Sequence, residues 1–536
     1  MAKYKDLNQE DKEYLAHFYH DRDMTHVEKM DILTKKYDVS ERTIRRWWRE
    51  ELKLSDIYVD LPPILREAMN RDISNKTDIL LITSAQNKTG VHTEMLDNIV
   101  SYKEFLESIG FKVEIVIAPA RYRNPTSPAE QLSQQEKASI QEWWRDEVKP
   151  YLFYNKIQFG DTLISCNSRI RPTAKKPLTG YEVLAKDNHL VLPHPRIHFK
   201  TMPRFKDAPL RSMLTTGYVT HKNYSDSKAG ETAFEHHSYG FVIVEKKEDG
   251  TCHCPRHVKV QKDGSFIDLM YQVKDKEVSI APPAKGIVWG DLHAAEVNKE
   301  IFDRTLDLYS VFKPEQTVIH DALDASTVNP HETKDMFIQR LKIAEGRYLI
   351  KNEIDHCFDL LSEIVDTGTK VNVIISNHDI FLDRHVNDGN WKKDLHNSPA
   401  YLEMALIQQT VDLRQYGSIF GYMLYTQFGD DVKYINFGES LDIGGYECAM
   451  HGDHGANGAR GSANTFSKLN TKMIGGHSHS PMILDGYTQV GVTCNLNQYY
   501  TRKGVSSWAH AHSIVHANDK NQLIVFGNDY KFTELI

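Results

Sequence analysis

The residues of this chain that could do chemistry are histidines and carboxylates that directly follow apolar runs in its second half. Five short polar motifs occur in this position: Asp291-Leu-His293, Asp321-Ala-Leu-Asp324, Asn377-His378-Asp379, His451-Gly452 and His477-Ser-His479. Imidazoles, carboxylates and an amide together suit borderline divalent cations such as Mn²⁺, Fe²⁺ or Zn²⁺. A single histidine at a strand end is more often just a hydrogen-bonded residue. Five such motifs in order indicate a metal site.

An α/β domain is the element arrangement that could bring these motifs together. Between residues 285 and 536, apolar runs of strand length alternate with helical segments, including 296–310 and 335–365. In open α/β sheets, ligands bind beyond the carboxyl ends of the strands, which is where all five motifs would converge. We therefore predict an α/β domain over 285–536 with a metal site at the carboxyl ends of its strands.

The five motifs, taken in order, resemble those of the calcineurin-like metallophosphoesterase superfamily over residues 285–536. This resemblance implies a β-sandwich flanked by helices and a centre of two divalent cations. Mn²⁺ is the first expectation, with Mg²⁺, Fe²⁺ or Zn²⁺ as alternatives. By position, Asp291, His293 and His479 would hold one cation, Asn377, His451 and His477 would hold the other, and Asp321 would bridge them.

The resemblance also implies that His378 protonates the leaving oxygen or contacts the scissile phosphate, with Asp324 as its orienting partner. Two cations about 3.5–4 Å apart stabilise both the attacking and the leaving oxygen and lower the pKa of a shared water. A carboxylate such as Asp321 can offer one oxygen to each ion. The neutral amide of Asn377 completes a ligand shell without adding negative charge near a phosphate.

Two positions depart from the superfamily pattern, which usually has glycine where this chain has His320 and Ser376. Both put a side chain where the backbone normally turns tightly. For His320 we favour a bulky residue displaced to the surface over a contact with substrate or with a supporting carboxylate. Within the fourth motif we favour His451 over His454 as the ligand, because His451 directly follows the apolar run and precedes a glycine.

Residues 1–56 are predicted to form a helix-turn-helix module. Its third helix spans 41–54 after Ser40 as N-cap, with Ile44 and one of Trp47 and Trp48 facing the core. Four arginines are left for the exposed faces: Arg42, Arg45, Arg46 and Arg49. A basic helix in this position is typical of DNA recognition in the major groove. The alternative is a small helical interaction or oligomerisation module.

The middle region, 57–284, is predicted to be α/β and rich in strands. A strand at 78–86, a helix at 92–110 and a strand at 111–119 indicate a parallel βαβ unit. Between residues 169 and 222, eleven Lys and Arg face three acids, a surplus that can bind a phosphate backbone or form an ordinary solvated surface. The Cys-x-Cys pair at 252 and 254 has a poor zinc spacing, and we expect no metal there.

Composition limits the class of protein. A chain of 536 residues is too long for one ordinary core, and 40% hydrophobic with 26% charged residues is typical of a globular protein. The net charge of −8 argues against a globally basic DNA-coating protein. Without an apolar leader or a membrane-length run, we expect a cytoplasmic protein, in the host cytoplasm if phage-encoded, with no membrane contact.

These features favour a Mn²⁺-dependent DNase that acts on DNA as substrate, in the manner of the DNA-repair nucleases of the superfamily. In size and architecture the chain also resembles the pre-early DNases with which some tailed phages degrade host DNA, which implies homo-oligomeric assembly. The first alternative is a phosphatase or nucleotide phosphodiesterase with small substrates. The second is a non-enzymatic DNA-binding regulator, which retention of all seven ligand positions disfavours.

Overall fold

The computed structural model describes residues 3–20, 24, 26–51, 63–122, 124, 126, 143–205, 208–330, 332–498 and 504–535. They divide into two compact units. One contains the described residues up to Arg71 together with Trp143, and the other contains those from Asp72 onward. The domain boundaries predicted after residues 56 and 284 stay predictions. No helix in the described ranges is both long and apolar enough to cross a membrane.

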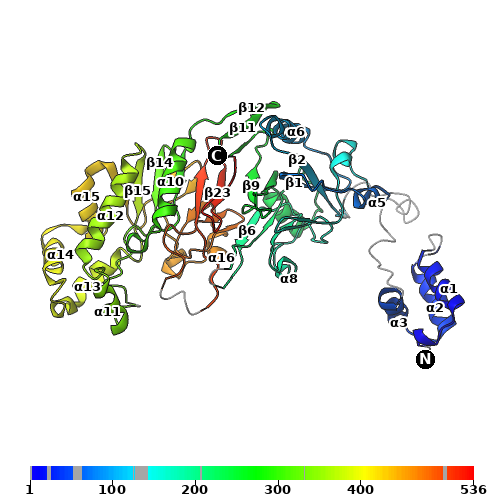
Figure 1. Cartoon of the computed structure of the whole chain (residues 1–536), viewed down its shortest axis with the longest axis horizontal. Helices are drawn as coiled ribbons and strands as arrows, with labels where there is room; N and C mark the ends of the chain where they lie inside the picture. Colours follow the sequence, from blue (N-terminus) through cyan, green and yellow to red (C-terminus); the bar gives the residue numbers. More distant parts are fainter. Residues whose placement is uncertain are drawn as a thin grey trace. The chain divides into compact units, whose positions relative to one another are not determined.

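The first unit is helical (Figure 1). Its elements are the 3-10 turn Tyr4–Asp6, α1 (Gln9–His20), α2 (His26–Tyr37), α3 (Glu41–Arg46), the π-helical turn Trp47–Glu51 and α5 (Pro63–Met69). Ser40 caps α3, because its hydroxyl accepts the backbone N–H of Thr43. The predicted third helix is therefore present but changes to a π-turn at Trp47, and residues 52–54 lie outside the described ranges.

A small aromatic core holds these helices together. Ile44 and both Trp47 and Trp48 are buried, so the sequence prediction that only one tryptophan faces inward was too narrow. The Trp48 indole donates a 2.9 Å hydrogen bond to the carbonyl of Leu15 on α1. The exposed arginines of α3 are as predicted: Arg42, Arg45 and Arg46. The side chain of Arg49 lies outside what the structure describes.

The second unit has a mixed α/β fold, as predicted, and begins with the expected βαβ unit. Strand β1 (Ile79–Gln86) leads through α6 (Thr93–Ser108) into β2 (Val113–Ala120), and the two strands pair in parallel. Antiparallel β8 (Gly240–Glu245) and β9 (Arg256–Lys259) complete a sheet of order β2-β1-β8-β9. A three-stranded sheet follows: β10 (Phe266–Asp268), β11 (Tyr271–Lys274) and β12 (Glu277–Ile280).

A six-stranded sheet forms the centre of the region after residue 285. Its order is β16 (Val432–Ile435), β15 (Lys370–Ile374), β14 (Gln316–Ile319), β13 (Gly286–Val288), β22 (Ala511–Val515) and β23 (Asn521–Val525). Strands β13 to β16 are parallel neighbours, whereas β22 and β23 run antiparallel. The parallel pairs need crossover connections, which the helices of this region supply.

Helices connect these strands and lie beside them in Figure 1. They are α10 (Lys299–Phe312), α11 (Met336–Ala344), α12 (Ile350–Val365), α13 (Ile380–Asp388), α14 (Ser398–Thr410) and α15 (Ile419–Phe428). The helical region predicted over 335–365 is thus two helices. Gly346, with φ of +72°, lies in the break between them and allows the chain to turn there.

A ten-stranded sheet crosses the predicted boundary at residue 284. Five strands precede it: β3 (Lys156–Phe159), β4 (Thr162–Ser165), β5 (His189–Leu192), β6 (His198–Thr201) and β7 (Ser212–Thr215). Five follow it: β17 (Asp442–Ile443), β18 (Tyr446–Glu447), β19 (Lys472–Gly475), β20 (Met482–Leu484) and β21 (Tyr487–Gln489). The two halves join where β6 pairs with β20. Short helices accompany this sheet: α8 (Glu182–Ala185), α9 (Lys228–His236) and α16 (Ala463–Phe466).

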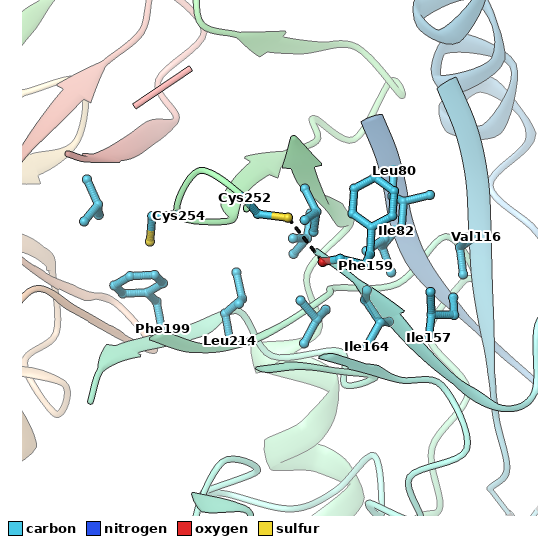
Figure 2. Close-up of a cluster of buried hydrophobic side chains, with 14 of the residues drawn as sticks. Leu80, Ile82, Val116, Ile157, Phe159, Ile164, Phe199, Leu214, Cys252 and Cys254 are labelled. Atoms are coloured by element: carbon cyan, nitrogen blue, oxygen red, sulfur yellow. Dashed lines mark hydrogen bonds between the residues drawn. The ribbon is translucent and has the colours of Figure 1, made fainter. Parts of the chain in front are cut away.

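Two apolar cores connect the sheets. The first lies between the four-stranded and ten-stranded sheets and includes Leu80, Phe159 and Phe199 (Figure 2). Cys252 and Cys254 belong to it, and the Cys252 thiol donates a hydrogen bond to the Phe159 carbonyl. Burial raises the pKa of both thiols to about 12, in keeping with their place among the apolar core residues.

The second core packs the six-stranded sheet against the β17–β18–β19 end of the ten-stranded sheet. Val288, Val318 and Ile374 of the first sheet meet Tyr446 and Ile474 of the second. All five are buried, and each lies on a strand that leads into one of the polar motifs or next to such a strand. This core therefore fixes the ends of both sets of strands relative to each other.

Candidate metal centre

The seven predicted ligands lie in loops that directly follow strands of two different sheets. Strands β13, β14 and β15 of the six-stranded sheet lead to the first three motifs, and β18 and β19 of the ten-stranded sheet lead to the last two. These positions at strand ends are as expected, and the strands belong to two sheets that pack across a shared core.

Four of the predicted ligands form the first group, and each offers a ligand atom within 4.8 Å of the others: Asp291, His293, Asp321 and His479. His479 Nε2 lies 3.0 Å from Asp291 Oδ2 and 3.1 Å from His293 Nε2. His293 Nε2 is 3.6 Å from Asp321 Oδ2. Two imidazole nitrogens and two carboxylates therefore face one point, which is an arrangement that can hold a cation.

A second group consists of Asp321, His451 and His477. His451 Nε2 approaches Asp321 Oδ2 to 3.1 Å, and the rings of His451 and His477 are 5.1 Å apart. Asp321 thus belongs to both groups. His454, the alternative ligand in this motif, is half exposed and pairs with Asp453 instead.

Several buried oxygen and nitrogen atoms of the predicted ligands have no hydrogen-bond partner among the described residues. They are Asp291 Oδ1, Asp321 Oδ1, Asn377 Oδ1, His451 Nδ1 and His479 Nδ1. Leaving buried polar atoms unpaired is unfavourable, and charged ones most of all. These atoms therefore fit a bound cation, and Asn377 can add a neutral amide oxygen to the ligands offered by the histidines and carboxylates.

Four of the predicted ligands have a strained backbone conformation. His293, Asp321, His477 and His479 all have positive φ, between +42° and +74°. Non-glycine residues rarely adopt this conformation, which persists only where surrounding structure imposes it, typically at functional sites. Gly476 allows one of these close approaches, because a Cβ there would collide with Asp291 Oδ1.

Asp324 links the metal groups to His378. Its Oδ1 lies 2.9 Å from His293 Nδ1 and 3.4 Å from His378 Nδ1. His378 Nδ1 also lies 2.6 Å from the backbone carbonyl of Asp324, to which it donates as the protonated nitrogen. Burial by itself would lower the pKa of His378, but the charges of Asp321 and Asp324 raise it to about 10.

The carboxylates of the site are held in their ionised form. Burial would raise the pKa of Asp321, but the neighbouring charges of His451 and His378 bring it well below its usual value. The pKa of Asp291 is lowered against its burial by His479 and His451. The charge of Asp321 in turn raises the pKa of His451 to about 9, although burial by itself would lower it.

His320 is not displaced to the surface, so the favoured interpretation of this departure was wrong. Its side chain is fully buried, and its ring lies 5.6 Å from that of His451. Neither ring nitrogen has a hydrogen-bond partner within the described part of the chain, and burial lowers its pKa to about 4. The neutral ring is therefore packed beside His451 in the interior and does not reach the surface.

Ser376, the second departure, closes the turn that carries Asn377 and His378. The Ser376 N–H donates to Asp379 Oδ2 at 3.1 Å, and the Asp379 N–H donates back to the Ser376 hydroxyl. This reciprocal pair resembles a capping box at the start of α13. Tyr434 donates a further hydrogen bond to Asp379 Oδ2. Sequence analysis named Asp379 in the motif but gave it no role.

A large cavity lies beside the first group. It has a volume of about 850 Å³, and its walls include Arg204, Glu296, Trp508 and His510. One of its wall residues contacts a predicted ligand, since the Trp508 ring lies 4.1 Å from that of His479. Nothing in the sequence singled out Trp508, which lies in no motif, and Arg204 was noted only as one cation of the basic segment 169–222.

The fold and the site thus define a mixed α/β protein whose buried Asp and His groups could hold metal ions. The chain is similar to Protein A1 of Escherichia phage T5, with 27% identity over 473 residues that cover 84% of this chain and 82% of that protein. No family model matches the chain. No solved structure matches it either.

Proposed function

We propose that this chain is a metal-dependent DNase that hydrolyses phosphodiester bonds with two divalent cations. The observation that carries the proposal is that two of the three candidate ligand groups in the described residues share Asp321; the third consists of His293, Asp324 and His378. A carboxylate common to two groups suits a centre of two ions, which is the arrangement used for in-line displacement at phosphorus. That the two packed sheets form the metallophosphoesterase sandwich is part of this proposal.

In this proposal Asp291, His293 and His479 hold the first cation, and His451, His477 and Asn377 hold the second. Asp321, which belongs to both groups, would be the ligand common to the two cations. Bound cations would neutralise the phosphate and lower the pKa of a water between them. The histidines around Asp291 and Asp321 keep these carboxylates ionised. Mn²⁺ is the first candidate for this mixed set of nitrogen and oxygen ligands.

His378 is proposed as the acid that protonates the leaving oxygen. Its Nδ1 is occupied by the Asp324 carbonyl and carboxylate, so Nε2 is the nitrogen left for the substrate. The hydrogen bond at Nδ1 fixes the orientation of the ring. The His378 side chain is also 14% exposed, unlike Asp321 and His451, so it can reach a bound substrate without being a ligand.

The proposal of DNA as substrate is supported by exposed basic side chains in both units. In the first unit these are Arg42 and Arg46. In the basic segment 169–222, several cations have structural partners: Arg196, Lys200, Arg204 and Arg211. An exposed run of four remains at its start: Arg169, Arg171, Lys175 and Lys176. Similarity to a phage protein agrees with this proposal without naming a substrate.

The decisive experiment incubates the purified chain with single-stranded, linear and circular DNA and with RNA, each in Mn²⁺, Mg²⁺ or chelator. We expect cleavage of DNA with Mn²⁺, none with chelator, and none by the Asp321→Ala variant. Intact DNA in every reaction would rule the proposal out. Turnover of a small chromogenic phosphate ester without DNA cleavage would favour the phosphatase alternative instead. Light scattering of the same preparation tests the predicted homo-oligomer.

A further inference from the structure

A second cavity lies away from the metal groups and is rich in basic side chains. It has a volume of about 320 Å³ and lies where β9, α9 and the β18–β21 part of the ten-stranded sheet meet. Six basic residues line it: Arg196, Lys222, Lys259, Lys262, Lys472 and Lys520. Only two carboxylates do so, Glu235 and Asp485. The cavity therefore has a surplus of four positive charges.

The lysines of this cavity are not neutralised by the protein. Among the described residues none of the five forms an ion pair, whereas Arg196 pairs with Asp485 at 2.9 Å. Lys259 donates to the neutral amide oxygen of Asn521, and Lys472 lies over the ring of Tyr446. Burial and the charges of Lys520 and Lys472 lower the pKa of Lys259 to about 7. These groups repel one another in the absence of an anion.

Arg196 adds a buried donor to the cavity. Its side chain is only 3% exposed, and Nη1 is used by Asp485. Its Nε and Nη2 atoms have no hydrogen-bond partner within the described residues. Guanidinium groups bind phosphate through paired N–H donors, and buried N–H groups without partners are unfavourable. Asp485 thus holds the arginine through Nη1, and the N–H groups of Nε and Nη2 stay available for a ligand.

The cavity is separate from the metal groups. Lys472 begins β19, and His477 follows the far end of the same strand. At about 3.3 Å per residue the two positions are about 16 Å apart along the chain. No predicted metal ligand lines the cavity. The two sites therefore lie at opposite ends of one strand.

The walls accept more than an inorganic ion. Ile197, Tyr239, Val260 and Ile483 contribute apolar or aromatic surface beside the basic groups. A cavity of this volume lies at the lower end of the range for small-molecule sites, which combine mostly apolar walls with a few oriented polar groups. This combination fits a phosphate attached to a sugar and a base.

We propose that this cavity is a second anion site, which binds the phosphate of a nucleotide apart from the metal centre. Arg196 and the lysines Lys472 and Lys520 hold the phosphate, and the apolar wall contacts the nucleoside. The nucleotide is either free or part of a DNA strand, since both present the same phosphate chemistry. The site needs no metal and does not rest on the proposed nuclease activity.

The test measures binding of radiolabelled dAMP to the full chain by equilibrium dialysis in chelator, which removes any contribution of a metal. We compare Lys472→Gln/Lys520→Gln with Lys370→Gln/Lys433→Gln, which makes the same change of charge at exposed lysines outside the cavity. The first variant should weaken binding at least tenfold and the second less than twofold. Thermal unfolding checks that both variants fold. Lys262 lines the cavity but is exposed, and we expect Lys262→Gln to weaken dAMP binding as well.

Failure of the wild-type chain to bind dAMP overturns the proposal, as does equal weakening by both double variants. A short single-stranded oligodeoxynucleotide is then added as competitor. Displacement of dAMP supports a cavity that receives a DNA strand, and absence of displacement supports one that takes free nucleotides. Competition is the readout because direct DNA binding would also report any contact made by residues 1–56.

Discussion

The two ends of β19 carry opposite chemistry. Beyond its last residue, His477 and His479 meet buried carboxylates, and each close contact pairs an imidazole with an acid or with another imidazole. At its first residue, Lys472 faces a cavity in which cations outnumber carboxylates. The first end is rich in carboxylates and imidazoles that can bind a cation, and the second is rich in positively charged N–H donors.

This difference shows how one short strand can separate two kinds of ligand. Buried groups of like charge are unfavourable unless a partner of opposite charge joins them. At the metal end, the partner that fits is a cation. At the lysine end, it is an anion. If the comparison is correct, changes at one end should leave binding at the other end intact.

The largest effect is expected from Asp321→Asn, which keeps the shape of the shared ligand but removes its charge. We expect the metal content to fall below two per chain and DNA cleavage to fall by about 10³-fold or more, equivalent to ~4 kcal/mol in the barrier. Elemental analysis and a plasmid assay measure these changes. Binding of dAMP in chelator should stay within twofold of wild type. Asp430→Asn, at an exposed acid, is the control.

A loss of dAMP binding in Asp321→Asn would break the comparison, because it would join the two ends into one site. Unchanged metal content would instead remove Asp321 from its proposed bridging position. The two outcomes are separable, since they are read in different assays.

His378→Gln is expected to cause a smaller loss of DNA cleavage activity than Asp321→Asn. Removal of a general acid reduces turnover by about 10²- to 10⁴-fold. Metal content should not change, because His378 is not proposed as a ligand. An activated ester with an acidic leaving group should lose much less activity than DNA, since its leaving oxygen needs no proton. Equal losses for both substrates would contradict the proposed role.

Binding of dAMP to the basic cavity should depend on pH, and in chelator no bound metal contributes to this dependence. The pKa of Lys259 is about 7, lowered by burial and by Lys520 and Lys472. Its positive charge is therefore present below pH 7 and is lost as the pH rises through that value. We expect affinity for dAMP to fall by up to about tenfold per unit between pH 7.5 and 9, above the second phosphate pKa of about 6.

Two other groups that line the cavity should not produce this profile. Asp485 is ionised because, against its burial, His198 and Arg196 lower its pKa, and His237 is neutral because burial lowers its pKa to about 3. Dialysis at several pH values gives the profile. The Lys259→Met variant should abolish the slope, and a flat wild-type profile would show that Lys259 does not contact the anion.

The smallest effect is expected from Arg42→Ala/Arg46→Ala on α3. Each phosphate contact contributes about 0.9 to the slope of log affinity against log salt, so loss of two should lower that slope by about 2. Fluorescence anisotropy with labelled duplex DNA measures it. Cleavage at saturating DNA should not change. Lys370→Ala/Lys433→Ala, at exposed positions elsewhere, should leave the slope unaltered.

Much of the metal end was predictable because its signal is local. Each ligand follows an apolar strand within a few residues, and the order of the motifs is preserved along the chain. The βαβ unit was predictable for the same reason, since a strand, a helix and a strand follow one another. The misjudged His320 shows the limit: a sequence cannot reveal that the space outside a turn is closed by a second sheet.

The sequence by itself determined which side chains could bind metal and that strands would end at them. Only the tertiary structure decided how the two sheets pack so that these ends meet, and that Trp508 adjoins His479. It alone also assembled the basic cavity, whose lysines are separated by up to about 300 residues. Hydrophobic periodicity and strand length act over neighbouring residues, whereas the packing of one sheet against another is set by contacts between distant segments.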